Sequence, residues 1–352
     1  MEEVFTIING IKNEVFPVRE IEIVKNEAGQ RLDKWLAKYM SKAPKSFFYK
    51  MLRKKNITLN AKKAEGNEKL LEGDIIRLFL AEETIQSFRE EVEVVQVSSK
   101  LDVLYEDENI LLINKPVGVL SQRAEKKDVS LVEMVIAYLL DTNALTKQEL
   151  MTFKPSICNR LDRNTSGIVV AGKSLPGLQE MAELFQQRSL HKFYRCIVKG
   201  EMKHGEKIAG YLTKDQKNNK VTVSPLQLEE LTDSAVSKSD ADIGSYIETQ
   251  YEPIETANGY TLLEVLLITG KTHQIRAHLA SIGHPLVGDY KYGDLTTNQM
   301  VKAKFGVDYQ LLHAYRLEFP RLLGTCANLS NQIFVCDPPK KFKEVEKKLI
   351  HR

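Results

Sequence analysis

The nine residues from Asn159 to Gly167 bring together side chains that could carry out chemistry. A carboxylate, Asp162, lies between two guanidinium groups, Arg160 and Arg163, and two hydroxyl residues and a glycine follow. A carboxylate flanked by cations stays ionised and can act as a nucleophile or a base. The same pattern also fits a structural Asx turn capped by hydroxyl groups. The residue types alone leave both interpretations open.

A second cluster extends from Thr269 to Gly293 and holds Lys271, His273, Arg276, His278 and His284. Its Gly-Lys-Thr sequence is not a phosphate-binding loop, because Val265 stands where the first glycine of that motif is required. His273 and His278 are five residues apart, which does not place two zinc ligands on one helical face. Arg276 is either a surface charge or the partner of a buried acid.

Strands and helices that would hold these clusters are predicted from hydrophobic periodicity and turn residues. Asn258 and Gly259 tolerate positive φ and predict a tight hairpin. Strands in meandering order predict an α+β domain on a mixed, mostly antiparallel sheet, with a polar loop at 233–244. The predicted hairpin spans 103–116 with its turn at 107–109, the other strands span 167–172, 192–200, 220–224, 246–255 and 260–268, and the helices span 130–141, 178–188 and 272–283.

Positive charge is concentrated between Arg31 and Lys63. This segment holds eleven lysine and arginine residues and one acid, Asp33, so its surplus is ten positive charges. The whole chain has a net charge of +3, which leaves −7 for the remainder. Such a surplus opposes folding unless a polyanion compensates it, and nucleic acid is the expected partner. A solvated lysine-rich helical face is the alternative.

Residues 20–80 predict a small α/β module with two amphipathic helices followed by strands. Helical spacing favours core packing over base stacking for Trp35, Phe47 and Phe48. Through RLDKWL, KMLRKKNITLN and EGDIIRL, the module resembles the small RNA-binding module shared by a ribosomal small-subunit protein, tyrosyl-tRNA synthetase and many RNA-modifying enzymes. The resemblance implies that six basic residues contact RNA phosphates without reading bases: Arg31, Lys34, Lys45, Lys50, Arg53 and Lys54.

The remaining composition suggests two domains and an intracellular setting. We expect an N-terminal extension at 1–19, the module at 20–80, a linker at 81–100 with at most one extended piece, a catalytic domain at 101–325 and a C-terminal extension at 326–352. Its basic tail at 338–352 is expected to be solvated, with phosphate contacts as the alternative. The chain lacks a signal-like start and an apolar run of about 18 residues, so a cytoplasmic monomer without membrane contact is expected. Four widely spaced cysteines predict neither a disulfide framework nor a metal site.

Five motifs, in order, resemble the RluA family of pseudouridine synthases: INKPVGVLS, NRLDRNTSG, KFYRCIVKG, ITGKTHQIRAHLASIGHPLVGDYKYG and LLHAYRLEFP. The resemblance spans Leu101 to Pro320 and implies the pseudouridine synthase fold. It implies that Asp162 is the catalytic aspartate and that Arg276 pairs with it. Tyr194 would then stack on the base and move a proton, and Arg160, with Arg163 beside it, would contact the RNA. Asn159 replaces the family's usual histidine, which predicts altered RNA contacts with activity retained.

The activity implied by this resemblance is that of an isomerase, an intramolecular transferase that turns uridine into pseudouridine in RNA. The target base must leave the stack to be reached. No cofactor or metal is expected, because no atom enters or leaves. Asp162 could add to the sugar, add to the ring or abstract a sugar proton, and all three routes stay open.

Large-subunit ribosomal RNA is the favoured substrate, with transfer RNA as the second candidate. The alternative function is a non-catalytic RNA-binding or ribosome-assembly factor on the same fold, which intact Asp162, Tyr194 and Arg276 argue against. A third hypothesis is a metal-free hydrolase that uses Asp162 with His273 or His313, and it would release uracil or cleaved RNA.

Overall fold

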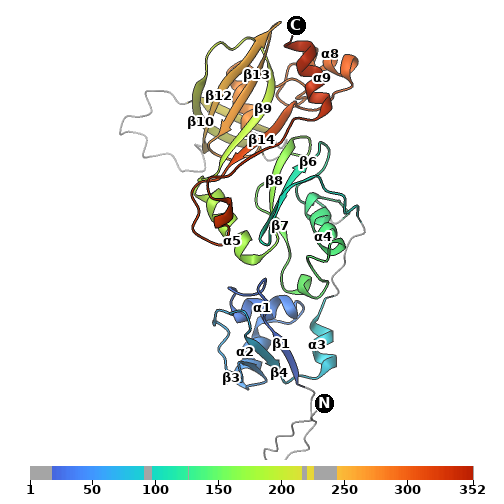
Figure 1. The fold of residues 1–352 in the computed structure, drawn as a ribbon, viewed down its shortest axis with the longest axis vertical. Coiled ribbons are helices and arrows are strands. Elements are labelled where there is room, and N and C mark those ends of the chain that lie inside the picture. The colour runs from blue at the N-terminus through green and yellow to red at the C-terminus, as the bar shows by residue number, and fades with distance from the viewer. Residues whose placement is uncertain (1–17, 91–96, 126, 216–219, 226–243, 352) are drawn as a thin grey trace, which may run out of the picture. The chain divides into compact units, whose positions relative to one another are not determined.

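A computed structural model describes residues 18–90, 97–125, 127–215, 220–225 and 244–351 (Figure 1). The chain forms two compact units. The smaller unit comprises Met1–Glu93 with Thr146–Lys154, and the larger comprises Val94–Leu145 with Pro155–Arg352. The polar loop predicted at 233–244 lies outside the described residues except for its last residue, as does the N-terminal extension before residue 18.

The smaller unit is an antiparallel sheet of four strands with helices packed against it. The order of the strands across the sheet is β1-β4-β2-β3. Its elements are β1 (Arg19–Glu22), α1 (Leu32–Tyr39), α2 (Lys45–Arg53), β2 (Ile57–Leu59), β3 (Lys62–Lys63), β4 (Ile75–Leu78), α3 (Glu82–Phe88) and the short 3-10 helix η1 (Glu149–Met151).

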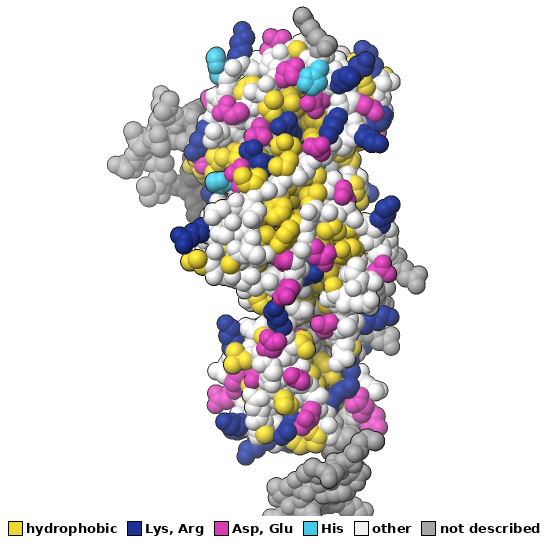
Figure 2. Space-filling view, in the orientation of Figure 1, with side chains coloured by type: hydrophobic (Ala, Val, Ile, Leu, Met, Phe, Trp, Pro, Cys, Tyr) yellow, Lys and Arg dark blue, Asp and Glu magenta, His cyan; other side chains and the backbone are white. Residues whose placement is uncertain are grey.

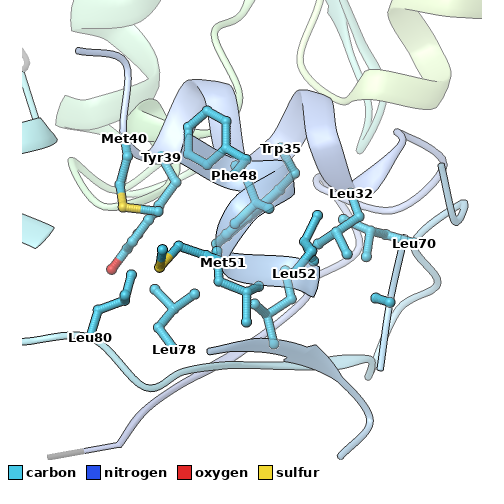
Figure 3. Close-up of a cluster of buried hydrophobic side chains, with 14 of the residues drawn as sticks. Leu32, Trp35, Tyr39, Met40, Phe48, Met51, Leu52, Leu70, Leu78 and Leu80 are labelled. Carbon is cyan, nitrogen blue, oxygen red and sulfur yellow. The ribbon is translucent and has the colours of Figure 1, made fainter. Parts of the chain in front are cut away.

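The core of the smaller unit forms between α1, α2 and the sheet (Figure 3). Trp35 and Phe48 are buried, as their helical spacing predicted, and Phe47 packs against the same cluster. The indole N–H of Trp35 donates to Glu27 at 3.0 Å, which satisfies its one polar group away from water. The aromatic side chains of these helices therefore stabilise the module, and basic residues occupy its surface.

Helix α3 lies where the sequence predicted a linker with at most an extended piece, and that secondary-structure prediction was wrong. Ile85 on α3 is fully buried in the core of the smaller unit, and Phe88 packs against the same core. A helix of seven residues has too few positions to show a periodic apolar face. Two apolar contacts three residues apart are nevertheless enough to hold it on a preformed core.

The larger unit is built on one sheet of eleven strands, in the order β11-β10-β12-β13-β9-β14-β8-β6-β5, with β15 paired to β14 and β7 paired to β8. These strands are β5 (Val103–Glu106), β6 (Ile110–Lys115), β7 (Ser156–Ile157), β8 (Ser166–Gly172), β9 (His191–Lys199), β10 (Glu206–Asp215), β11 (Lys220–Pro225), β12 (Ser245–Ala257), β13 (Tyr260–Leu267), β14 (Leu312–Glu318) and β15 (Ile333–Val335).

The sheet is mixed and mostly antiparallel, which confirms the predicted fold class. Its parallel pair joins β14 to β8, where His313 lies opposite Ser166 and Ala314 lies opposite Gly167. The other named pairs within the described strands are antiparallel. The predicted hairpin between β12 and β13 is also confirmed, because Asn258 and Gly259 both adopt positive φ.

Gly167, the last residue of the segment from Asn159 to Gly167, has a steric role. Gly167 has φ +111°, and a Cβ atom placed on it would lie 2.2 Å from the carbonyl oxygen of Ala314. No other residue fits this approach without moving the backbone. Gly167 thus allows β8 to begin against β14 directly after the segment that carries Asp162.

In the described part of the larger unit, these helices pack on the sheet: α4 (Leu131–Asp141), α5 (Leu175–Gln186), α7 (Gln274–Ser281), α8 (Leu295–Phe305) and α9 (Lys340–Leu349). In Figure 1, α4 and α5 lie on opposite sides of β6 and β8, which accords with the burial of every residue of β8. Ser130 and Glu133 form a capping box that begins α4. In the described parts of the chain, no helix is long and apolar enough to cross a bilayer.

The C-terminal residues are packed, so the prediction of a solvated tail was wrong. Phe342, Val345 and Leu349 on α9 are buried in a cluster that also contains Val301 of α8. These three residues follow helical spacing, and the lysines between them face solvent. The lysine-rich composition of this segment led to the wrong prediction, although its apolar residues form a narrow stripe along one side of the helix.

Candidate active site

Asp162 lies in a turn between β7 and β8, in which the N–H of Thr165 donates to the carbonyl oxygen of Asp162 at 3.0 Å. Its neighbours on both sides are fastened to the segment after β6. The hydroxyl of Ser121 donates to the Leu161 carbonyl at 2.7 Å and accepts from the Leu161 N–H at 3.0 Å. These contacts fix the backbone of the turn without using the carboxylate of Asp162.

Lys115 is a fully buried cation that fixes the same turn. Its ammonium group donates to the carbonyl oxygens of Pro116, Val119 and Arg163 at 3.0, 2.8 and 3.1 Å. Burial lowers the pKa of Lys115 to about 8, and the charge of Asp162 opposes that shift. A buried ammonium is tolerated when all three donors are used. The INKPVGVLS motif therefore acts as a clamp on the Asp162 turn.

Arg276 links Asp162 to a second, buried carboxylate. Its Nη1 donates to Asp162 Oδ2 at 2.7 Å, and its Nε and Nη2 donate to the two oxygens of Asp289 at 2.7 and 2.9 Å. Burial would lower the pKa of Arg276, but bonds to Asp289 and the charges of both acids raise it above its ordinary value. Arg276 is thus the partner of a buried acid rather than a surface charge, and it holds the Asp162 carboxylate in one orientation.

Asp289 was missed at the level of sequence. Its side chain is fully buried and also accepts the backbone N–H groups of Lys291 and Tyr292 at 2.9 and 3.2 Å. Burial would raise the pKa of Asp289, but Arg276 and these two N–H groups lower it. Its position thirteen residues after Arg276 follows no helical or strand period, so only its place within the cluster from Thr269 to Gly293 could have pointed to it.

His273 also faces the carboxylate of Asp162. Its Nε2 lies 3.9 Å from Asp162 Oδ2, and its Nδ1 lies 2.9 Å from the hydroxyl of Tyr292. The Tyr292 hydroxyl accepts the N–H of Val221 at 3.0 Å, so its own hydrogen can point to Nδ1 of His273. Burial is the main cause that lowers the pKa of His273. His273 has φ +55° at the start of α7, an uncommon conformation of the kind found at functional sites.

Tyr194 on β9 is buried beside the same carboxylate. Burial, and then the charge of Asp162, raise the pKa of its hydroxyl well above the ordinary value. The hydroxyl therefore carries its proton at neutral pH. In the described residues, Tyr194, Asp162 and Arg276 all line one cleft of about 780 Å³. The cleft is large enough for a flipped nucleoside, and Asp162 is the one carboxylate among its described lining residues.

The described lining of this cleft is otherwise rich in cations: Arg123, Arg160, Arg163, Arg188, Lys192, Lys271 and Arg276. Arg160 is exposed at the cleft, whereas the Nε of Arg163 donates to the carbonyl of Gly118 at 3.1 Å. Asn159 is directed into the fold, because its side chain bonds the backbone of Ile168 and Val170 on β8. No group of three or more metal-binding side chains occurs in the described part of the chain.

The basic residues predicted to bind phosphates are all exposed on the smaller unit. Arg31 forms an ion pair with Asp33 at 3.0 Å. Four others lie on α2 or at its C-terminal end, which concentrates positive charge on one short helix: Lys45, Lys50, Arg53 and Lys54. The face drawn in Figure 2 instead shows basic and acidic side chains interspersed. Positive charge is therefore concentrated on α2 and does not form a continuous patch on the face drawn.

Comparison with known proteins agrees with this geometry. Residues 109–281 match the family model described as RNA pseudouridylate synthase. An uncharacterized RNA pseudouridine synthase of Mycoplasma genitalium is 32% identical, over 85% of this chain and 88% of that protein. Ribosomal large subunit pseudouridine synthase C of Escherichia coli is 28% identical, over 88% of this chain and 91% of that protein.

A solved structure supports the fold. Human RNA pseudouridylate synthase domain containing 4 superposes with a TM-score of 0.55 at 23% identity, over 70% of this chain and 92% of that one. From sequence and fold together, the chain belongs to the RNA pseudouridylate synthase family. It is an RNA pseudouridine synthase, an isomerase that converts uridine in RNA into pseudouridine.

Proposed function

We propose that this enzyme modifies uridines of large-subunit ribosomal RNA and that Asp162 is its catalytic residue. The observation that carries the proposal is the chain Asp162–Arg276–Asp289 at a cationic cleft, because it presents one oriented carboxylate where a nucleotide would bind. The Asp162 side chain is 27% exposed and therefore reachable, whereas that of Asp289 is fully buried. Relatives named ribosomal large subunit pseudouridine synthase C support the choice of RNA.

The reaction needs a carboxylate and a proton carrier but no external atom. The bond from C1′ of the ribose to N1 of uracil breaks, the base turns, and a bond from C1′ to C5 forms. The hydrogen on C5 leaves and N1 gains one, so atoms balance. Asp162 acts at the reacting atoms, Tyr194 packs on the base with its protonated hydroxyl near the same centre, and Arg276 positions Asp162. Arg160 and Arg163 contact the RNA at the mouth of the cleft.

The test is pseudouridine mapping, by carbodiimide modification and primer extension, in cells that lack this protein. Wild type should restore the missing ribosomal sites, and Asp162→Asn should restore none. Asp308→Asn is the matched control, because Asp308 is an exposed aspartate whose ion pair with Lys302 lies outside the cleft. Activity of Asp162→Asn would refute its role, and sites lost only from transfer RNA would overturn the choice of substrate.

We further propose that the exposed cations of α2 anchor the RNA by its phosphates. Replacing Lys50, Arg53 and Lys54 by Ala should weaken binding and reduce the slope of log affinity against log salt by about 2 to 3, since each lost contact releases fewer counterions. A variant without the exposed α9 lysines removes equal charge and should keep the slope: Lys341, Lys347 and Lys348. Equal slopes for the two variants would contradict anchoring by α2.

A further inference from the structure

Lys192 is a lysine of the cleft whose charge has no acidic partner among the residues that the structure describes. It is the second residue of β9, two positions before Tyr194, so both side chains point to the same face of the sheet. Both line the cleft that contains Asp162. Within the described residues, the ammonium group of Lys192 forms neither a hydrogen bond nor an ion pair, and it is partly buried.

The surroundings of this ammonium group are apolar or positive. It lies 5.9 Å from the centre of the Phe185 ring, and a Cβ atom placed on Gly270 would be 3.9 Å from it. Burial, and then the charge of Arg188, lower the pKa of Lys192. An ammonium group that is partly removed from water without a counter-charge destabilises the free protein. An anion supplied by the substrate would compensate it.

Other cations of the cleft differ in this respect. Arg276 is paired with two aspartates, and Arg123 is paired with Glu133 at 3.0 Å. Four further cations of the described lining have no side-chain partner, but they are exposed and water solvates them: Arg160, Arg163, Arg188 and Lys271. Lys192 combines partial burial with the lack of a partner, which is the arrangement expected of a preformed anion site.

We propose that Lys192 binds a backbone phosphate of the target nucleotide, an inference that rests on the proposed function. Residues two apart on a strand are separated by about 7 Å. If Tyr194 packs on the uracil, Lys192 therefore lies at the distance of the attached sugar and phosphate. A uracil carbonyl is neutral and would leave the ammonium charge uncompensated, whereas a phosphate forms a charge-assisted hydrogen bond with it.

The experiment combines protein and RNA substitutions in one cycle. Binding of an RNA fragment with the modified site is measured for wild type and Lys192→Met, with a neutral methylphosphonate placed 5′ or 3′ of the target uridine. Lys192→Met should weaken binding to unmodified RNA by about 10-fold or more, which is the usual range for a hydrogen bond between charged groups. One methylphosphonate should cause a similar loss for wild type and little further loss for Lys192→Met.

Controls separate this role from a structural one. Without RNA, Lys192→Met should unfold at the same temperature as wild type or higher, because an uncompensated charge has been removed. Lys199→Met, at the other end of β9, removes an exposed lysine that pairs with Asp294 at 2.9 Å, and its effect should be independent of both methylphosphonates. If the loss of affinity from Lys192→Met adds to the loss from the methylphosphonate at both the 5′ and the 3′ position, the proposal is overturned.

Three further outcomes are decisive. A fall in kcat for Lys192→Met with an unchanged salt dependence of binding would place the ammonium group on the uracil instead, and the proposal would be wrong. If Asp162→Asn abolishes modification but the losses from Lys192→Met and the methylphosphonates are additive, the phosphate contact of Lys192 is rejected and the proposed function stands. Wild-type protein that does not modify the RNA would reject the proposed function itself.

Discussion

Asp289→Asn should destabilise the enzyme more than Asp162→Asn does. The change keeps the shape of the side chain but removes the charge that faces two nitrogens of Arg276 at 2.7 and 2.9 Å. Breaking a buried pair costs about 3–5 kcal/mol when one charge is left uncompensated. Since Arg276 keeps its bond to Asp162, the lower figure of about 3 kcal/mol applies. Asp162 is 27% exposed and has one such bond, so its removal should cost about 1 kcal/mol.

Thermal unfolding monitored by calorimetry measures this difference. For a unit of this size each kcal/mol shifts Tm by about 2–4 °C, so Asp289→Asn should lower Tm by about 6–12 °C and Asp162→Asn by only a few degrees. Single-turnover rates should rank the variants in the opposite order, because Asp289→Asn only loosens the group that orients Asp162, at a cost of about 10²-fold. Equal Tm values for the two variants would refute Asp289 as the anchor of Arg276.

Three further predictions concern other residues of the larger unit. Gly167→Ala should lower stability by about 3 kcal/mol in thermal unfolding, whereas Gly118→Ala, also at positive φ but with open space around it, should cost about 1 kcal/mol, and similar losses would contradict the steric role. Tyr194→Phe should lower kcat by about 10²-fold or more with KM little changed, and an unchanged kcat would remove its hydroxyl from proton transfer. His278 and His313 are buried, and burial lowers the pKa of each to about 4, below the unfolded value near 6.5. Stability should therefore fall as pH drops below 6.5, by about 2 kcal/mol per histidine at pH 5, and a Tm that is flat between pH 7 and 5 would contradict this.

Local structure was predictable where one physical cause dominates. Asn258 and Gly259 form the expected hairpin because few residue pairs accept two positive φ values in succession. Trp35 is buried because its spacing on α1 places it towards the core. The types and order of the motif residues also pointed to Asp162 and Arg276, and the structure places their side chains 2.7 Å apart.

Features that depend on distant partners were not predictable. Asp289 resembles any loop aspartate until the fold brings Arg276 against it. Asn159 replaces the family's usual histidine, and its contacts run to the backbone of β8, which the sequence could not indicate. The apolar face of α9 was not recognised in the sequence, because it consists of three buried residues in a segment whose composition is mostly lysine and glutamate. Packing across the chain, rather than local propensity, decided these cases.

The place of β14 in the sheet governs when this enzyme can become active during its synthesis. The strand begins at Leu312 of 352 residues, and it lies between β9, which carries Tyr194, and β8, which follows Asp162. Chains fold from the N-terminus as they leave the ribosome. The smaller unit, whose last segment ends at Lys154, is complete in sequence long before that point. If the smaller unit binds RNA as proposed, the nascent chain could hold RNA well before β14 joins β8 to β9.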